Sequence, residues 1–173
     1  MFQIRILEQK DAASYRELRL KSYQESPFAF SESYEDEVKK SLTDFQEELK
    51  VEGTPPEQFI LGVYTPGDEL AGFVKFRRDK RSKARHKSMI HAMYIGKDYR
   101  NQQLGKMLID DLIGRVSQLE GLEQIHLWVL HSQRSASDFY SRCGFESQGP
   151  FVKKDLKVNG AYVDAEYMVM YFE

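Results

Sequence analysis

Residues 93–106 read MYIGKDYRNQQLGK, in which a short apolar stretch turns directly into the start of a long helix. The apolar positions of that helix recur every three or four residues, at Leu104, Met107, Leu108, Leu112, Ile113 and Val116. The first amides of a helix have no partner within it and lie at the positive end of its dipole, so they can bind a phosphate group. The stretch therefore predicts a strand, a phosphate-binding turn and a helix, which alone would suit many phosphate ligands.

The flanking sequence predicts further strands and helices around this unit. Apolar and β-branched runs favour strands at residues 4–7, 59–64, 70–76, 89–95, 125–130, 145–152 and 161–172. Helical spacing favours helices at residues 11–23, with Asp11 as N-cap, and at 34–51, 104–119 and 135–142. Asn159-Gly160 predicts a hairpin turn before the last strand. The order predicts one α/β domain over residues 1–173, with helices flanking a mixed, mostly antiparallel sheet.

Composition limits the classes of function. The chain has 173 residues, 41% of them apolar and 30% charged, and its net charge of −2 gives no overall attraction to nucleic acid. Cys143 is the one cysteine, so an intrachain disulfide is impossible, and no Cys/His spacing suggests a metal site. The sequence has no signal-peptide pattern and no membrane-spanning run. We therefore expect a cytoplasmic protein that binds neither metal, nucleic acid nor membrane.

The 93–106 stretch resembles the phosphate-binding motif of the GNAT acetyltransferases, which is Arg or Gln, two residues, Gly, one residue, then Gly or Ala. Arg100 and Gly105 match the first and last positions, and Gln103 stands where the middle glycine is usual. Glycine there lets the backbone approach a pyrophosphate without an intervening side chain, whereas backbone amides survive any side-chain change. The resemblance implies that the cofactor is bound by Arg100, Asn101, Gln102, Gln103, Leu104, Gly105 and Lys106.

A second motif of the same superfamily follows at residues 133–145. The family pattern is Asn-x-x-Ala-x-x-(Leu/Phe)-Tyr-x-x-x-Gly-Phe, and every marked position matches except the first, where Gln133 replaces asparagine. The resemblance implies a sheet that splays between its fourth and fifth strands, with the pantetheine arm of coenzyme A in the gap. Met93, Ile95, Gln133, Ala136 and Phe139 would then hold this arm. The two motifs together are specific, whereas either one alone would not be.

The activity implied by this resemblance is direct transfer of an acetyl group from acetyl-CoA, as co-substrate, to a primary amine. Tyr140 matches the family tyrosine that protonates the departing thiolate. An alkyl ammonium has a pKa of about 10, so a base must remove its proton. His91 is the candidate base because strand alternation would point it the same way as Met93, two residues on. It also resembles a histidine of the arylalkylamine N-acetyltransferases.

The acceptor, a small molecule or a peptide, is not identified by the sequence. In this superfamily the segment between the first two helices commonly covers the acceptor pocket, so Tyr23, Phe28 and Phe30 are candidate contacts, with core packing as the alternative. Asp164 on the last strand is a further candidate for attracting the amine, with plain surface charge as the alternative.

Two alternative functions remain open. One is a non-catalytic acyl-CoA-binding or scaffold module of the same shape. Another is a factor that contacts RNA or an acidic acceptor through the basic run at 77–87, although a solvated hairpin loop is the simpler interpretation of that run. We expect a monomer or a homodimer.

Overall fold

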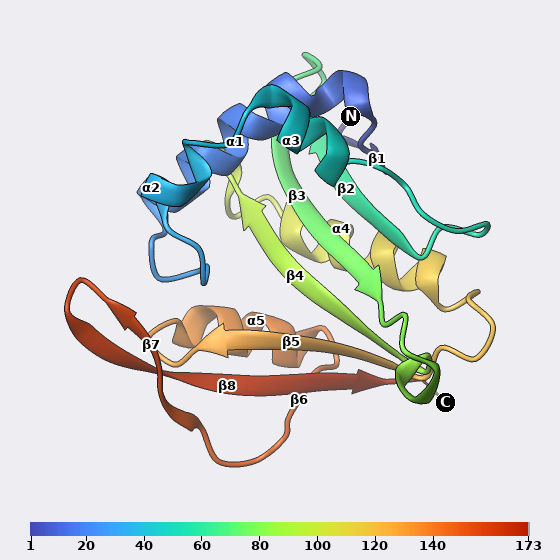
Figure 1. Ribbon diagram of the computed structural model, residues 1–173. Helices are drawn as coiled ribbons and strands as arrows, with labels where there is room; N and C mark the ends of the chain where they lie inside the picture. The colour runs from blue at the N-terminus through green and yellow to red at the C-terminus, as the bar shows by residue number, and fades with distance from the viewer. Residues whose placement is uncertain (173) are drawn as a thin grey trace.

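The computed structural model describes residues 1–172, which form a single mixed sheet with helices on both faces (Figure 1). The strand order is β1-β2-β3-β4-β5-β8-β6, with β7 paired to β8. The strands are β1 Gln3–Ile6, β2 Gln58–Tyr64, β3 Leu70–Arg78, β4 Lys87–Ile95, β5 Gln124–Leu130, β6 Glu146–Ser147, β7 Val152–Val158 and β8 Ala161–Tyr171. Neighbours are antiparallel except for the parallel pair β4 and β5, which confirms the predicted fold class.

The helices divide between the two faces of the sheet. The α-helices are α1 Ala12–Glu25, α2 Tyr34–Glu37, α3 Leu42–Glu48, α4 Leu104–Val116 and α5 Arg134–Arg142, and the short 3-10 turns are η1 Gln9–Asp11, η2 Ser82–Ala84 and η3 Lys97–Tyr99. Leu108 and Leu112 of α4 are fully buried in one core cluster, and α5 packs against the same cluster. Tyr15 of α1 and Phe45 of α3 are fully buried in a second cluster on the opposite face. Each such side chain contributes about 1.5–3 kcal/mol through burial, so both helix layers are firmly attached.

The sheet opens between β4 and β5. The two strands pair only at Lys87–Gln124, Ser88–Ile125 and Met89–His126, and then diverge toward their C-terminal ends (Figure 1). A β-bulge interrupts β4 at this point, because Phe76 of β3 faces Ile90 while Lys75 faces Ala92. A bulge bends its strand and increases the local twist. The predicted splay between the fourth and fifth strands is therefore present.

The predicted helix over residues 34–51 is wrong, since two short helices separated by a break occupy this region. Ser33 Oγ accepts a hydrogen bond from the Asp36 amide at 3.2 Å, and Ser41 Oγ accepts one from the Asp44 amide at 3.2 Å. Asp44 in turn accepts from the Ser41 amide at 2.7 Å, which completes a capping box. Each serine thus begins a new helix and stops the chain from continuing the previous one.

Two further predictions need correction. The strand expected at 145–152 is only Glu146–Ser147, because Gly149 adopts a φ of 124° and Pro150 follows it. Asp11 does not cap α1 with its side chain; its carboxylate instead binds Arg5 at 2.7 Å, which lowers the pKa of Asp11 to about 2.

The Asn159-Gly160 turn is confirmed, with both residues at positive φ. None of the helices within residues 1–172 has the length and apolar character needed to cross a bilayer.

Candidate active site

The turn that leads into α4 exposes a run of free amides. Asn101 and Gln103 both adopt the left-handed conformation, with φ of 61° and 60°, and α4 begins at the next residue, Leu104. Within residues 1–172 the amides of Asn101, Gln102 and Gln103 have no main-chain acceptor. The first-turn amides of α4 have none within the helix by geometry. Successive free amides of this kind can form a concave site for an anion, and Gln103 beside them is exposed.

Gly105 holds the start of α4 close to β4 and α5. A Cβ atom at this position would lie 3.3 Å from Met93 Cε and 3.3 Å from the ring of Phe139. These distances leave little room for a side chain. The last glycine of the motif therefore serves close packing, and Phe139 belongs to the core under α5.

The two cations of the motif are already engaged. Arg100 Nε donates to the carbonyl of Ile95 at 3.1 Å, and its guanidinium lies over the ring of Tyr94, 5.6 Å from the centroid. Lys106 pairs with Asp110, one turn along α4, at 2.6 Å. Arg100 therefore secures the end of β4 and occupies the carbonyl of Ile95, one of the groups predicted to hold pantetheine.

A cavity of about 90 Å³ lies in the opening between β4 and β5. Its walls combine four segments that are distant in the sequence: Ala29 from the loop after α1, His91 and Met93 from β4, Trp128 from β5, and Gln133, Ala136 and Tyr140 from α5 and its N-cap. The structure thus brings together the predicted catalytic residues and most of the predicted pantetheine contacts in one small cavity.

Tyr140 presents its hydroxyl to this cavity. The hydroxyl donates to Met93 Sδ at 3.6 Å, and thioether sulfur is a weak acceptor. The ring is wedged edge-on between Phe139 and Phe145, with centroids 5.2 Å and 5.6 Å away. Burial raises the pKa of Tyr140 well above its ordinary value, so the phenol is protonated at neutral pH. A proton donor with only a weak internal acceptor is therefore available beside the opening.

His91 is not related to Met93 by simple strand alternation, contrary to the expectation from sequence. It occupies the bulge: Ile90 packs in the α4 core and Ala92 in the opposite core, although they are only two residues apart. His91 lines the small cavity and also a second, larger one on the face opposite α4. Desolvation within the cleft, with Arg77 and Lys75 nearby, lowers its pKa to about 4. The imidazole is therefore neutral at pH 7 but a weak base.

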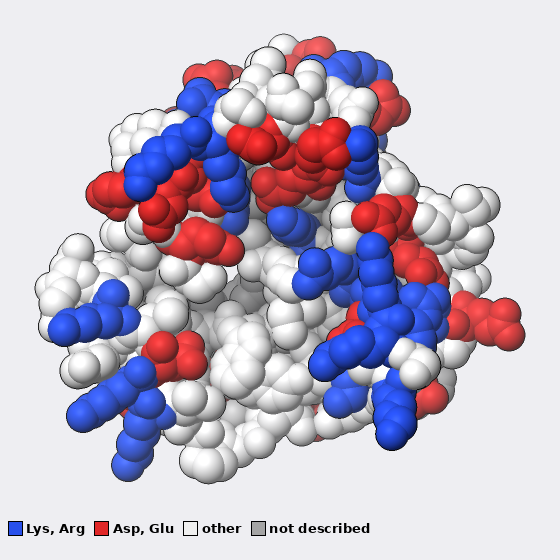
Figure 2. Space-filling view, in the orientation of Figure 1, with Lys and Arg blue, Asp and Glu red and all other residues white. Residues whose placement is uncertain are grey.

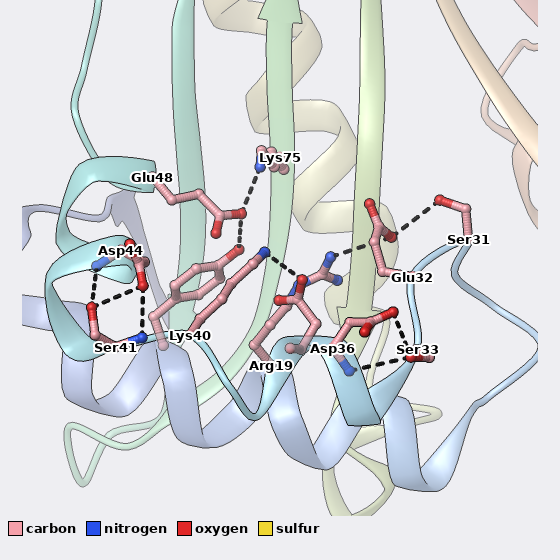
Figure 3. Close-up of polar contacts among 12 residues, drawn as sticks. Arg19, Ser31, Glu32, Ser33, Asp36, Lys40, Ser41, Asp44, Glu48 and Lys75 are labelled. Carbon is pink, nitrogen blue, oxygen red and sulfur yellow. Dashed lines mark hydrogen bonds and ion pairs between the residues drawn. The ribbon is translucent and has the colours of Figure 1, made fainter.

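The predicted acceptor contacts Tyr23 and Phe30 lie in the core and not in a cavity wall. Both are nearly fully buried around the guanidinium of Arg19, whose Cζ lies 4.6 Å and 4.8 Å from their ring centroids. Arg19 pairs with Glu32 at 3.9 Å (Figure 3). Cation–π contacts with these rings replace part of the hydration that a buried guanidinium loses.

The residues between Tyr23 and Phe30 are less buried than these two rings. Phe28 is half-buried, and Ala29 lines the small cavity, so the segment reaches the opening through its alanine.

Asp164 Oδ1 accepts a hydrogen bond from the Lys154 amide at 2.8 Å, where Lys154 adopts a φ of 56°. Asp164 thus stabilises the irregular part of the β7–β8 pairing.

The larger cavity, of about 500 Å³, was not predicted from the sequence. Its lining includes Arg77, Lys87, His91, His126 and Tyr167. Tyr167 also stacks with Trp128, at 4.6 Å between centroids, so an aromatic surface connects the two cavities. Figure 2 shows the hollow, with uncharged atoms on its floor, acidic residues on its upper rim and basic residues to its right. The basic run at 77–87 was the only sequence signal for this cavity.

Comparison with known proteins gives a consistent result. The model of the Acetyltransferase (GNAT) family matches residues 14–145. An acetyltransferase of the GNAT family from Streptococcus pneumoniae is similar over 99% of this chain and 100% of its own, with a TM-score of 0.84 and 21% identity. No curated protein matches the sequence.

Two more solved structures are similar over almost the whole chain. Ribosomal-protein-alanine N-acetyltransferase from Brucella melitensis is 15% identical with a TM-score of 0.82, covering 98% of this chain and 99% of its own. A phosphinothricin acetyltransferase from Sinorhizobium meliloti, in complex with acetyl-CoA, is 19% identical with a TM-score of 0.79, covering 99% and 88%. At these identities the likeness shows the fold alone.

Proposed function

Because the chain belongs to the GNAT acetyltransferase family, we propose that it transfers an acetyl group from acetyl-CoA directly to the primary amine of an acceptor. The observation that carries this proposal is the convergence of Tyr140, Met93 and Gln133 on one cavity, between strands that have stopped pairing. The free amides at the start of α4 lie on the same face of the sheet, since Gly105 contacts Met93 and Phe139.

The residues present suit coenzyme A. Its diphosphate would lie against the amides of residues 101–106, which have no main-chain acceptor in the described part of the chain and lie at the positive dipole end of α4. Its pantetheine arm would enter between β4 and β5, where the unpaired edge of β4 beyond Met89 offers backbone groups. Gln133 would supply an amide from the start of α5. A likeness in fold to a structure that contains acetyl-CoA supports the same assignment.

In this proposal the thioester supplies the activated acyl group, and side chains of this protein donate and accept the protons. As the nitrogen bonds to the acyl carbon and the C–S bond breaks, Tyr140 donates to the leaving sulfur its proton, for which Met93 Sδ competes only weakly. The tyrosinate then takes the second proton that the nitrogen loses on becoming an amide. His91 receives the proton of the amine, directly or through water, from the acceptor side of the opening. The pKa of His91 is about 4, so the free protein holds it as a weak base. It accepts a proton more readily once a bound acceptor offsets the positive charge of the neighbouring cations.

The first test is binding of acetyl-CoA followed by measurement of free thiol over a panel of amines. Calorimetry should detect acetyl-CoA binding at micromolar protein, and thiol release should require an amine. Binding without amine-dependent thiol release would instead support the non-catalytic acyl-CoA-binding module. Absence of binding would rule out both of these functions.

The Tyr140→Phe variant tests whether Tyr140 is the acid that protonates the leaving sulfur. The variant should lower kcat by roughly 10²-fold while leaving acetyl-CoA affinity nearly unchanged, because it removes only the hydroxyl. Tyr162→Phe is a matched control, since Tyr162 is 59% exposed and lies on the β7–β8 hairpin. An unchanged kcat in Tyr140→Phe would remove Tyr140 from the mechanism.

A further inference from the structure

The larger cavity gathers basic residues from three neighbouring strands onto one face. Arg77 of β3 faces Met89 of β4, and Met89 faces His126 of β5, so these positions form a row across the sheet. Lys87 lies two residues before Met89 and therefore points to the same face. All four line the cavity, as does His91 on the side toward the opening.

Most cations around this cavity are neutralised by acidic partners. Arg78 and Arg85 both pair with Glu57, at 2.9 Å and 2.6 Å. Arg81 pairs with Asp79 at 2.6 Å, and Lys80 pairs with Glu52. These contacts hold the 77–87 segment against the rest of the protein and leave little of its charge available.

Lys75 is neutralised in the same way, from α3. Its Nζ lies 2.5 Å from Glu48 Oε1, which also accepts from the Tyr15 hydroxyl at 3.1 Å (Figure 3). Arg77 and Lys87, by contrast, have no acidic partner within residues 1–172. The cavity therefore presents two cations that no salt bridge among the described residues neutralises, although the Asp79 carboxylate also lines it.

We propose that the acetyl acceptor carries an anionic group, a carboxylate or a phosphate, that binds between Arg77 and Lys87 while its amine reaches the opening beside Tyr140. The inference rests on the proposed function and adds the chemical class of the acceptor. His91 lines both cavities, so they adjoin at this residue, and an acceptor long enough to span four residues of β4, about 13 Å, would reach from Arg77 to Tyr140. The stacked rings of Trp128 and Tyr167 form the surface between them.

Desolvation is the main cause of the lowered pKa of both cavity histidines, and neighbouring cations add to it. Desolvation and then Arg77 and Lys75 lower the pKa of His91, with Glu32 as an opposing charge. Desolvation and then Lys87 and His86 lower the pKa of His126. An anion bound between Arg77 and Lys87 offsets their positive charge and raises both pKa values. The acceptor thereby makes His91 a stronger base when it binds.

The test compares amines that differ in the anionic group. The probes are 8-aminooctanoate against 8-aminooctanamide for the carboxylate, and 6-aminohexyl phosphate against 6-aminohexanol for the phosphate. The anionic member of at least one pair should have a kcat/KM about 10-fold higher or more, as expected for charge-assisted hydrogen bonds. The pair with the larger ratio identifies which anion the cavity accepts.

Substitutions then test whether Arg77 and Lys87 cause the preference for the anionic amine. Arg77→Gln and, independently, Lys87→Gln should reduce that ratio to within about 3-fold, a loss of most of one charge-assisted contact. Lys83→Gln is the matched control, because Lys83 belongs to the same segment but does not line the cavity. Equal kcat/KM within both pairs, or an equal loss of preference in the control, would overturn the inference and leave the acetyltransferase proposal intact.

Direct binding separates this inference from the proposed function. Histidine ring resonances should show the midpoints of His91 and His126 rising by about half a pH unit or more when 8-aminooctanoate or 6-aminohexyl phosphate is added, whether or not acetyl-CoA binds. No rise with either probe contradicts the anion site. Tight binding of single-stranded RNA that blocks both probes would assign the cavity to nucleic acid and also contradict it.

Discussion

Gln103 shows how one residue can depart from a motif and still preserve its geometry. The position adopts a φ of 60°, a left-handed conformation that strains a side chain with a Cβ atom and that glycine adopts freely. The usual glycine is therefore explained by backbone conformation as well as by access to the phosphates. The Gln103 residue itself is exposed.

Gln103→Gly should stabilise the protein by about 1 kcal/mol, because it relieves the left-handed strain at the start of α4. Urea unfolding would measure the change. Gln102→Gly serves as control, since Gln102 is also exposed but is not among the residues with positive φ. The control should lose stability, and a gain of equal size in both variants would argue against the explanation.

At the scale of elements, α4 has two glycines with opposite surroundings. A Cβ at Gly114 would meet nothing within 4 Å, whereas a Cβ at Gly105 would lie 3.3 Å from both Met93 and Phe139. One helix therefore carries a glycine that close packing requires and another that only weakens helix formation.

Gly114→Ala should raise the free energy of unfolding by about 1 kcal/mol, the helix preference of alanine over glycine, without changing acetyl transfer. Gly105→Ala should raise the free energy of unfolding by a smaller amount, because Met93 or Phe139 must move to admit the methyl group. It should also slow transfer by shifting the wall of the small cavity. Denaturant curves and thiol-release rates on both variants would test this contrast, and an equal gain with normal activity in Gly105→Ala would contradict it.

At the scale of the whole molecule, the two cavity histidines link stability to pH. The pKa values of His91 and His126 fall from 6.5 to about 4 in the folded protein, but His91 is exposed, so solvent screening reduces its contribution relative to that of His126. Between those pH values the unfolded chain binds protons that the folded chain does not, so stability is present above pH 6.5 and is lost as pH falls. Carboxylates add to the loss below about pH 5, where unfolded Asp and Glu begin to bind protons.

His126→Gln should therefore make the free energy of unfolding less sensitive to pH between 6.5 and 5. Urea titrations at both pH values, on the wild type and the variant, give this difference directly. His126 is the better of the two for this test because it is 4% exposed. A variant with the wild-type slope would show that His126 does not contribute to the linkage.

Features that depend on neighbours in the chain were predictable from the residues. Helix α4, the turn before it and the Asn159-Gly160 hairpin follow from local spacing and from backbone preferences. The short α2 and α3 were missed because Ser33 and Ser41 favour new helix starts over the continuous apolar pattern. The two family motifs led to Tyr140 and Gln133, which do line one cavity.

Features that depend on packing between distant segments were not predictable. The bulge at His91 breaks the two-residue alternation of β4, and the pairing with β3 that creates it is not encoded in β4 alone. Which cations remain unpaired depends on acids far away in the chain, such as Glu48 for Lys75 and Glu57 for Arg78. Local patterns reflect backbone preferences and burial, whereas the charge inside a cavity is a sum over groups that only the folded chain brings together.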